Sequence, residues 1–276
     1  MRIVSLPFTD YCSILADDYD SEMEICRDLI QEGKIRGCIL EIRNPTVMTE
    51  TFKSCSYYKQ HLLRLNEDPK AVFGNCDKKT IQYNIRKAQK AGIVVKEWNS
   101  DYGIRELYKL MNITRKRHGV PTQPKQYFDN IKKNIITPGL GSIFLASYND
   151  RAIAAGLFLY HKNIVIYKYN ASDCKNSGNL TPNHLLTWEA IRNACARGYG
   201  VLDFGRTSPD NAGLMRYKQM WGATAFALPY SFFPTVKSPS LVSESGNAYR
   251  LLRTVWRYLP MSITDILGKV LYRYTA

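Results

Sequence analysis

Long hydrophobic runs are missing from this chain, and so is a secretion signal. The longest apolar stretch, Ile153–Tyr160, has the length of a strand, whereas a membrane-spanning helix needs roughly 18 apolar residues. The N-terminus has no hydrophobic stretch followed by a small-residue cleavage site. We therefore expect a cytoplasmic location, with peripheral membrane association as an open alternative.

Grouped cysteines and histidines are also missing. The seven cysteines are odd in number and form no Cys-x-x-Cys pair, and the four histidines have no metal-ligand spacing. These patterns predict neither a zinc site nor a disulfide framework. We expect reduced structural thiols, no metal and no tightly bound cofactor.

Acidic residues are in short supply after the first 80 positions. The net charge is +14 over 276 residues, and it is uneven: residues 1–80 carry −2, whereas residues 81–145 and 146–276 carry +8 each. This asymmetry favours a polyanionic partner, such as a nucleotide-linked substrate, tRNA or an anionic membrane surface. A basic surface that only keeps the protein soluble is the alternative.

What is present is an ordinary globular composition, 45% hydrophobic and 22% charged, with clear periodic segments. Helical spacing and end signals predict helices at 20–32, 78–91, 104–118, 124–136, 181–197, 214–221, 247–258 and 263–274. Apolar alternation or short apolar runs predict strands at 2–8, 35–42, 57–65, 93–98, 142–148, 152–160, 164–171, 201–204 and 223–230. The segment 57–65 is alternatively an amphipathic segment of another kind.

Residues 101–230 thus follow the order α-α-β-β-β-α-β-α-β. Two helices precede a three-strand meander, and a helix then connects two strands that must lie parallel. An α+β, or mixed α/β, fold follows from this order. It is the order of a GNAT acyltransferase module.

Five segments strengthen this interpretation. They are TPNHLLTWEAI from Thr181, GYGVLDFGRT from Gly198, MRYKQMWGA from Met215, LPFTDY from Leu6 and IRKAQKAG from Ile85. Together they resemble the FemAB/FemX branch of the GNAT acyltransferases, which adds aminoacyl groups to peptidoglycan precursors. The resemblance covers residues 4 to about 230 in the family's order.

The resemblance implies a GNAT-type fold with one complete C-terminal module and a partial N-terminal module. Family members usually carry some tens of residues before the Leu-Pro-Phe element, so this chain is a shortened member or lacks its start. We expect a partial module with a basic linker helix at 1–98, an acyltransferase module at 99–233 and a helical extension at 234–276.

The acyl donor is the next question. Before the helix at Thr181 there is no Arg/Gln-x-x-Gly-x-Gly/Ala loop of the kind with which GNAT enzymes hold the CoA pyrophosphate on backbone amides. Its absence favours aminoacyl-tRNA, the donor of the FemAB branch, and acyl-CoA stays open.

Asp203 and Arg206 are the candidate catalytic residues. Acyl transfer needs a neutral amine, a polarised carbonyl and two aligned substrates. Asp203 ends a short strand before Gly205, where it can accept a proton or orient the amine; alternatively, it holds the turn at 205–207 through backbone N–H groups. Arg206 can fork onto a phosphate or carboxylate. Its alternative is a salt bridge to Asp203 or a plain surface charge.

The candidate substrate-binding residues are Lys218, Tyr169, Asn183, Tyr217, Asp10 and Arg86. Lys218 follows Tyr217 near a glycine turn, which suits diphosphate binding; alternatively, its charge lies in water while its stem covers the helix. Tyr167 and Tyr169 alternate on one strand, so we expect them on one face, lining an acceptor groove or packing. Arg86 lies on a basic helix that faces tRNA or a nucleotide diphosphate, or only solvent. Asp10 and Asn183 come from the segments that carry the resemblance.

The chain end adds two predicted amphipathic basic helices, 247–258 and 263–274, after a Pro- and Ser-rich linker at 234–246. They dock on an anionic membrane or pack against the module. The leading functional hypothesis is an acyl- or aminoacyltransferase acting on an amine of a nucleotide- or lipid-linked cell-envelope precursor. The alternatives are an acyl-CoA-dependent N-acyltransferase on an amino sugar of an exopolysaccharide, and a non-catalytic binding protein with a degenerate double-GNAT fold.

Overall fold

The computed structural model describes residues 2–6, 9–45, 53–234, 247–260, 263, 264 and 267. The helices in these ranges are α1 (Tyr19–Arg36), α2 (Pro69–Asn75), α3 (Tyr83–Lys90), α4 (Asp101–His118), α5 (Lys125–Ile131), α6 (Cys174–Ser177), α7 (Pro182–Ala196), α8 (Ala212–Met220) and α9 (Asn247–Tyr258). The π-helical turns are η1 (Lys78–Gln82), before α3, and η2 (Lys132–Ile136), after α5. The strands are β1 (Arg2–Val4), β2 (Ile39–Arg43), β3 (Lys53–Arg64), β4 (Val94–Glu97), β5 (Gly141–Tyr148), β6 (Arg151–His161), β7 (Ile164–Ser172), β8 (Val201–Thr207) and β9 (Thr224–Phe233).

The described strands form one sheet in the order β1-β2-β9-β3-β8-β7-β6-β5-β4. β1 pairs parallel with β2, and β7 pairs parallel with β8, as the helix connection between them predicts; the other neighbours are antiparallel. β3 lies between β8 and β9, so an early strand fills a place beside two late ones. The predicted modules at 1–98 and 99–233 therefore share one sheet, and their independence as domains stays a prediction.

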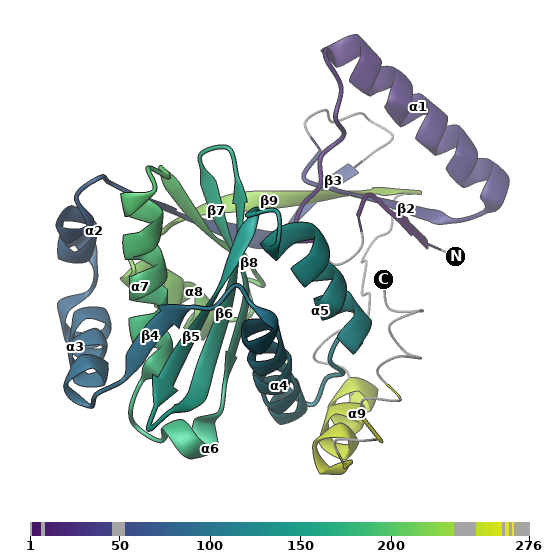
Figure 1. Ribbon diagram of the computed structural model, residues 1–276. Coiled ribbons are helices and arrows are strands. Elements are labelled where there is room, and N and C mark those ends of the chain that lie inside the picture. The colour runs from purple at the N-terminus through teal and green to yellow at the C-terminus, as the bar shows by residue number, and fades with distance from the viewer. Residues whose placement is uncertain are drawn as a thin grey trace.

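Two helical layers enclose the part of the sheet formed by β4–β7 (Figure 1). α7 packs on one face of these strands and is covered in turn by α2 and α3, whereas α4 packs on the other face, together with α5. α1 lies apart from both layers, beside β2 near the sheet edge (Figure 1). The mixed α/β fold class predicted from the sequence is confirmed.

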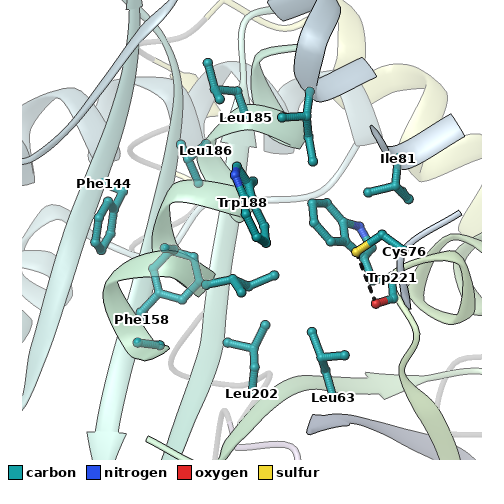
Figure 2. Packing of buried hydrophobic residues seen from close by; sticks show 14 of the residues in the cluster. Leu63, Cys76, Ile81, Phe144, Phe158, Leu185, Leu186, Trp188, Leu202 and Trp221 are labelled. Carbon is teal, nitrogen blue, oxygen red and sulfur yellow. Dashed lines mark hydrogen bonds between the residues drawn. The ribbon is translucent and has the colours of Figure 1, made fainter. Parts of the chain in front are cut away.

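The core under α7 is built from large apolar side chains, including Phe158, Leu186 and Trp221 (Figure 2). Leu186 and Trp221 are fully buried, and each such side chain contributes about 1.5–3 kcal/mol to stability. A second cluster fills the space between α4, α5 and the opposite face of the sheet. The two clusters fix the strands on which the candidate site is built.

The C-terminal helix α9 packs on the end of α4. Gly119 ends α4 with a left-handed φ of 71°, and a Cβ at this position would lie 2.4 Å from the carbonyl oxygen of Arg253. Trp256 is buried, whereas Val255 and Tyr258 are exposed. The packing expected for the first C-terminal helix is therefore present, and contact with a membrane stays a prediction.

Several elements differ from the sequence-based predictions. The short helix α2 was not predicted, although Asp68 caps it by accepting from the N–H of Lys70 and Pro69 occupies its first turn. The segment 57–65 belongs to the longer strand β3, and the helix predicted at 124–136 changes from α5 to η2 after Ile131. The linker 234–246 beyond its first residue, Pro7 and Phe8, and most of the predicted helix 263–274 lie outside the described residues.

Candidate functional site

The parallel strands β7 and β8 part within the sheet. Their pairing joins 164–166 to 201–203 and stops there, although β7 continues to Ser172 and β8 to Thr207. The second half of β8 pairs with β3 on its other side, where Gln60 faces Arg206. An opening at the carboxyl ends of parallel strands is a frequent ligand position in α/β sheets.

Asp203 lies where this opening begins and is fully buried. Its Oδ1 accepts from the N–H of Gly205 at 2.7 Å, and its Oδ2 accepts from Gln60 Nε2 at 2.7 Å and from Tyr11 Oη at 3.0 Å. Burial raises the pKa of this carboxyl group, since a buried charge has lost its hydration. The bond to Gly205 is the one expected of an aspartate that holds the following turn.

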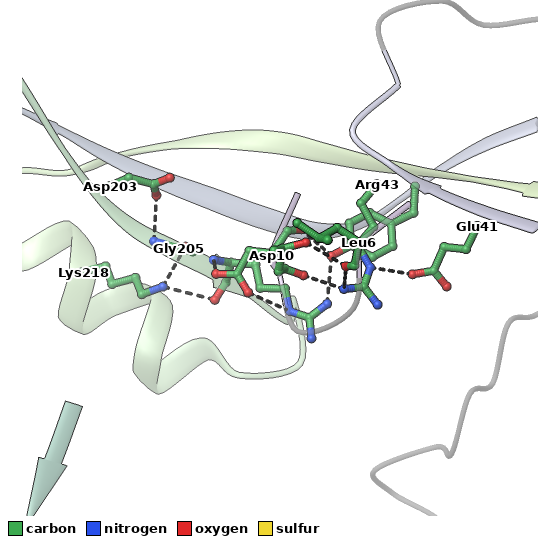
Figure 3. Close-up of polar contacts among 10 residues, drawn as sticks. Leu6, Asp10, Glu41, Arg43, Asp203, Gly205 and Lys218 are labelled. Carbon is green, nitrogen blue, oxygen red and sulfur yellow. Dashed lines mark hydrogen bonds and ion pairs between the residues drawn. The ribbon is translucent and has the colours of Figure 1, made fainter. Parts of the chain in front are cut away.

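Gly205 makes the next step of β8 possible. Its φ is +71°, which favours glycine, and an added Cβ would lie 2.5 Å from Asp10 Oδ2. The segment that contains Asp10 therefore crosses directly over β8 (Figure 3). Asp10 also accepts a hydrogen bond from the backbone N–H of Arg206 at 3.2 Å.

The Arg206 guanidinium is held by several groups. Its Nε lies 3.5 Å from Asp10 Oδ1, Nη1 donates to Tyr230 Oη at 2.8 Å, and the group lies 4.6 Å from the centre of the Tyr58 ring. The alternative of a salt bridge between Arg206 and Asp203 is wrong. The carboxyl group of Asp203 is taken up by N–H and O–H donors, whereas Asp10 is the acid that reaches the guanidinium.

Lys218 on α8 points under the same turn (Figure 3). Its Nζ donates to the carbonyl oxygens of Gly205 at 2.9 Å and Arg206 at 3.2 Å. The residue is only 5% exposed, so the alternative of a lysine whose charge lies in water is wrong. Burial lowers the pKa of Lys218 to about 8, against the opposing effect of Asp10 and Asp203. The ammonium ion is therefore easily deprotonated by lysine standards.

Aromatic side chains surround the start of α7 and the neighbouring α8. The His184 ring lies 5.6 Å from that of Tyr217 and 6.4 Å from that of Trp221. Burial lowers the pKa of His184 to about 4, so the imidazole is neutral at pH 7. The preceding residue, Asn183, has a buried Oδ1 without a hydrogen-bond partner among the described residues. Asn183 and Tyr217 thus belong to one region next to Lys218.

Tyr167 and Tyr169 do not share a face, contrary to the prediction. The pairing of β6 with β7 shifts register, from Leu157 opposite Tyr169 to Phe158 opposite Tyr167. A bulge of one residue reverses the alternation of side chains that follows it. Tyr167 consequently stacks on Phe158 at 4.3 Å, whereas the Tyr169 hydroxyl is bonded to Tyr127 at 2.9 Å and Gln123 at 3.0 Å beside α5.

The structure therefore brings Asp203, Arg206, Lys218 and Asp10 together. Tyr217 and Asn183 lie nearby on α8 and α7, whereas Tyr169 is buried beneath α5 and Arg86 is exposed on α3 beside Phe73. Their roles in binding stay predictions. The sequence did not predict Gln60 or Tyr230 as site residues, because Gln60 binds Asp203 and Tyr230 binds Asp10 only through contacts between strands and segments far apart in the chain.

A second polar group supports the N-terminal segment. Arg43 Nε donates to Glu41 Oε1 at 2.8 Å, and Arg43 Nη1 donates to the carbonyl oxygens of Thr9 at 2.6 Å and Leu6 at 3.2 Å (Figure 3). Arg2 also pairs with Glu41. Glu41 and Arg43 are both buried. Arg43 thus anchors the segment that carries Asp10 and Tyr11.

Two further findings concern the described ranges alone. Every helix within them is too short or too polar to span a bilayer. Among the described residues, no group of three or more His, Cys, Asp or Glu side chains is arranged to hold a metal ion.

Comparison with known proteins shows the family to which the chain belongs. The family model described as "Acetyltransferase (GNAT) domain" matches residues 77–219, just over half of the chain. No curated protein matches in a sequence comparison. The structure is similar to that of FemX, with a TM-score of 0.62 at 15% identity over 90% of this chain and 85% of FemX.

Two further structures are similar to this chain. L-PGS from Bacillus licheniformis has a TM-score of 0.59 at 10% identity, over 87% of this chain and 80% of that one. The C-terminal domain of a putative lysylphosphatidylglycerol synthetase from Agrobacterium fabrum has a TM-score of 0.60 at 7% identity, over 79% and 75%. At these identities the likeness concerns the fold, and the family model decides membership. The chain belongs to the GNAT acyltransferase family.

Proposed function

We propose that this protein transfers an acyl or aminoacyl group to an amine of a cell-envelope precursor. The observation that carries the proposal is the buried ammonium group of Lys218 at the opening between β7 and β8, beneath the turn at Gly205 and Arg206. A desolvated cation at such an opening stabilises negative charge that develops on a reacting carbonyl oxygen. FemX and L-PGS share the fold, and FemX motivates the choice of a precursor as acceptor.

Lys218 has the capacity for this role. A lysine ammonium has three N–H groups, and two of those of Lys218 are bonded to backbone carbonyls. These bonds fix the direction of the remaining N–H, which donates to the carbonyl oxygen of the acyl donor. A fixed donor costs no reorganisation when the oxygen becomes negative.

The acids divide into two roles in this proposal. Asp203 is fully buried, so it acts as a positioning residue that holds Tyr11, Gln60 and Gly205. Asp10 has a side chain that is 33% exposed, and its carboxylate orients the attacking amine or accepts its proton. Arg206, fixed against Asp10 and Tyr230, presents its remaining N–H groups to a phosphate or carboxylate of the precursor.

The reaction then runs between two substrates held on either side of β8. The amine nitrogen attacks the carbonyl carbon of the donor, the new C–N bond forms, and the bond to the donor's oxygen or sulfur breaks. Asp10 accepts the proton of the amine and passes it to the leaving oxygen or sulfur, so that the donor departs as an alcohol or a thiol. We favour aminoacyl-tRNA as donor because the segment before α7 lacks the glycine-rich pyrophosphate loop.

The test is a transfer assay with purified protein. Labelled aminoacyl-tRNA and acyl-CoA are offered in parallel with a nucleotide-linked peptide precursor, a lipid-linked precursor and an amino sugar. Lys218→Met and Asp10→Asn are each expected to lower transfer by about 10²-fold or more. Lys162→Met, which changes an exposed lysine in a strand connection, is the matched control and keeps full activity.

Absence of product from every donor and acceptor pair, with a folded protein, would sink the proposal in favour of a binding protein. Full activity of Lys218→Met would move the chemistry away from this opening.

The acyl-CoA-dependent alternative is favoured by one observation. The Thr181 side chain caps no amide at the start of α7, and its Oγ1 donates to the carbonyl oxygen of Asn84 at 2.9 Å. Uncapped helix amides are suited to a pyrophosphate. Acyl transfer from acyl-CoA to an amino sugar, without transfer from aminoacyl-tRNA, would replace the leading proposal by this one.

A further inference from the structure

A groove with a volume of about 380 Å³ lies where α2, α3 and α7 meet, on the flank shown by these helices in Figure 1. Its volume falls within the range of small-molecule sites. The residues that matter for its chemistry are Lys70, Phe73, Arg86, Gln89, Trp188 and Arg192. None of them contacts Asp203, Lys218 or Asp10 through a hydrogen bond or ion pair among the described residues.

Two aromatic rings form the apolar part of the groove. The Phe73 and Trp188 rings have centroids 4.9 Å apart at an interplanar angle of 53°. Trp188 is held by the core, since it is 8% exposed and packs among Leu185, Leu186 and their neighbours (Figure 2). Because the core already holds Trp188, the part of its ring that lines the groove does not need to be ordered when a planar ligand binds.

Cations surround these rings on every contributing helix. The Arg86 guanidinium lies 5.7 Å from the centre of the Phe73 ring, and its one described hydrogen bond is to the neutral amide of Gln82. Arg192 is neutralised by Glu189. No carboxylate pairs with Lys70 or Arg86 among the residues that the structure describes. The groove thus combines an apolar aromatic wall with two cations that no acid neutralises.

We propose that this groove binds a nucleoside phosphate. The base lies against Phe73 and Trp188, the phosphate lies between Arg86 and Lys70, and the Gln89 amide reads a polar edge of the base. A purely apolar ligand would leave the two cations without a partner, and inorganic phosphate would leave the aromatic wall unused. A flat ring joined to an anion uses both. The ligand is a free nucleotide or an unpaired nucleotide at the end of an RNA strand.

The position of the groove connects it with the candidate site. Trp188 follows His184 by one helical turn on α7, and these two residues lie on one side of the helix. His184 in turn contacts Tyr217 and Trp221. A nucleotide in the groove therefore rests on the helix that borders the opening of β7 and β8. The inference concerns binding only and holds whichever acyl donor the enzyme uses.

The experiment measures binding without any acyl transfer. AMP, UMP and inorganic phosphate are titrated by calorimetry, and a fluorescein-labelled single-stranded RNA of about five nucleotides is titrated by anisotropy. AMP or UMP is expected to bind with a Kd below about 1 mM, and inorganic phosphate at least about tenfold more weakly, because the stacking energy is absent.

Three variants locate the binding. Arg86→Ala changes an exposed side chain and removes the phosphate partner, and Phe73→Leu removes a ring while keeping bulk; each is expected to weaken nucleotide binding by about tenfold. Arg105→Ala, which removes an exposed arginine from α4 on the opposite face of the sheet, is the control and is expected to leave binding unchanged. Circular dichroism checks that each variant is folded.

The two sources of the ligand give different results. RNA that binds at least about tenfold more tightly than AMP, with the same loss in Arg86→Ala, identifies a strand end; equal affinities identify a free nucleotide. No binding of either ligand at millimolar concentration overturns the proposal. So does binding that Arg86→Ala and Arg105→Ala weaken equally, because attraction to overall positive charge would then account for it.

Discussion

The two halves of the sheet are stabilised in different ways. In the half formed by β4–β7, helices cover both faces, and the buried side chains of β5 and β6 are almost all apolar. In the half formed by β8, β3, β9, β2 and β1, the buried side chains include Glu41, Arg43 and Asp203, together with Lys218 of the neighbouring helix α8. In Figure 3, Arg43 binds the segment near the N-terminus that carries Leu6 and Asp10, whereas Asp203 and Lys218 both bind the turn at Gly205.

This difference separates a half of the sheet that supports the fold from a half that holds the candidate site. An apolar half tolerates variation in composition as long as volume is kept, so it serves as a scaffold. A buried ionic group costs desolvation free energy, and removal of one partner leaves the other charge without compensation. The candidate site lies in the half of the sheet that contains these buried charged groups. The four predictions below test whether the halves differ in this way, from the largest expected effect to the smallest.

The first prediction concerns Arg43→Ala in the polar half. The change leaves Glu41 with Arg2 as its remaining ion-pair partner and frees the carbonyl oxygens of Thr9 and Leu6. We expect the free energy of unfolding to fall by about 3–5 kcal/mol, measured by urea denaturation.

Arg151→Ala in the apolar half is the matched control, because Arg151 makes a 3.5 Å ion pair with Asp173 through a side chain that is 55% exposed. It is expected to cost no more than about 1 kcal/mol. Equal losses in the two arginine variants would remove the distinction between the halves.

The second prediction concerns Leu157→Ala in the apolar half. Leu157 is fully buried in the cluster beneath α4 and α5, and the cavity should lower the free energy of unfolding by about 2–5 kcal/mol. Transfer activity per folded molecule should be unchanged, because no candidate site residue leaves its place. Leu157→Met should cost less than about 1.5 kcal/mol. A loss of activity beyond the loss of folded protein would show that the scaffold also tunes the site.

The third prediction concerns pH and Lys218. The folded pKa is about 8, whereas the ordinary value is 10.5. Between these values the unfolded state binds a proton that the folded state does not, so stability should rise with pH in this window. From pH 8 to pH 10.5 the free energy of unfolding should rise by about 3 kcal/mol on account of Lys218. Below pH 8 the contribution of Lys218 to stability should not change with pH.

The measurement is the difference in the free energy of unfolding between the wild type and Lys218→Met at several pH values. The contributions of other groups that titrate in this range are the same in both proteins and therefore cancel in the difference. A difference that does not change from pH 8 to 10 would contradict a buried ammonium group. If its charge is needed for transfer, activity should fall over the same interval.

The fourth prediction concerns Asp203→Asn. The amide keeps the shape of the carboxyl group, but its NH₂ faces donors such as Gln60 Nε2 or Tyr11 Oη. We expect a loss of about 1–3 kcal/mol in the free energy of unfolding for the disturbed buried hydrogen bonds. If Asp203 acts by positioning Tyr11, then Tyr11→Phe should lower kcat similarly, and the double variant should be no worse than the single ones. Additive losses in kcat would instead place Asp203 in direct contact with the substrate.

Much of the fold could be predicted from local patterns. The strands of the meander and the helix before Gly119 follow from periodicity and end signals, because these features act over a few residues. The position of β3 could not be predicted, because its partners β8 and β9 lie far along the chain and strand order leaves no local trace. The bulge that separates Tyr167 from Tyr169 also escaped, since one extra residue changes the face without changing composition.

The site was predictable in part for the same reason. Asp203, Arg206 and Lys218 were singled out by their place in a strand, turn and helix, and they do lie together. Asp10 is also among the predicted site residues, but its ion pair with Arg206 and the bond of Tyr11 to Asp203 could not be predicted, because each joins opposite ends of the sequence. The exposure of a lysine is likewise decided by packing, and Lys218 gave no local sign that it would be buried.

The position of β3 has a consequence for synthesis of the protein. β3 ends at Arg64, but its neighbours β8 and β9 are complete only when the ribosome has reached Phe233. At the usual rate of translation the strand waits roughly ten seconds or more with both edges unpaired. Pairing over such long separations in sequence is also intrinsically slow. During synthesis, the N-terminal part of the chain therefore exposes an unpaired, aggregation-prone strand. We expect the yield of folded protein in cells to depend on translation speed and on chaperones that bind β3.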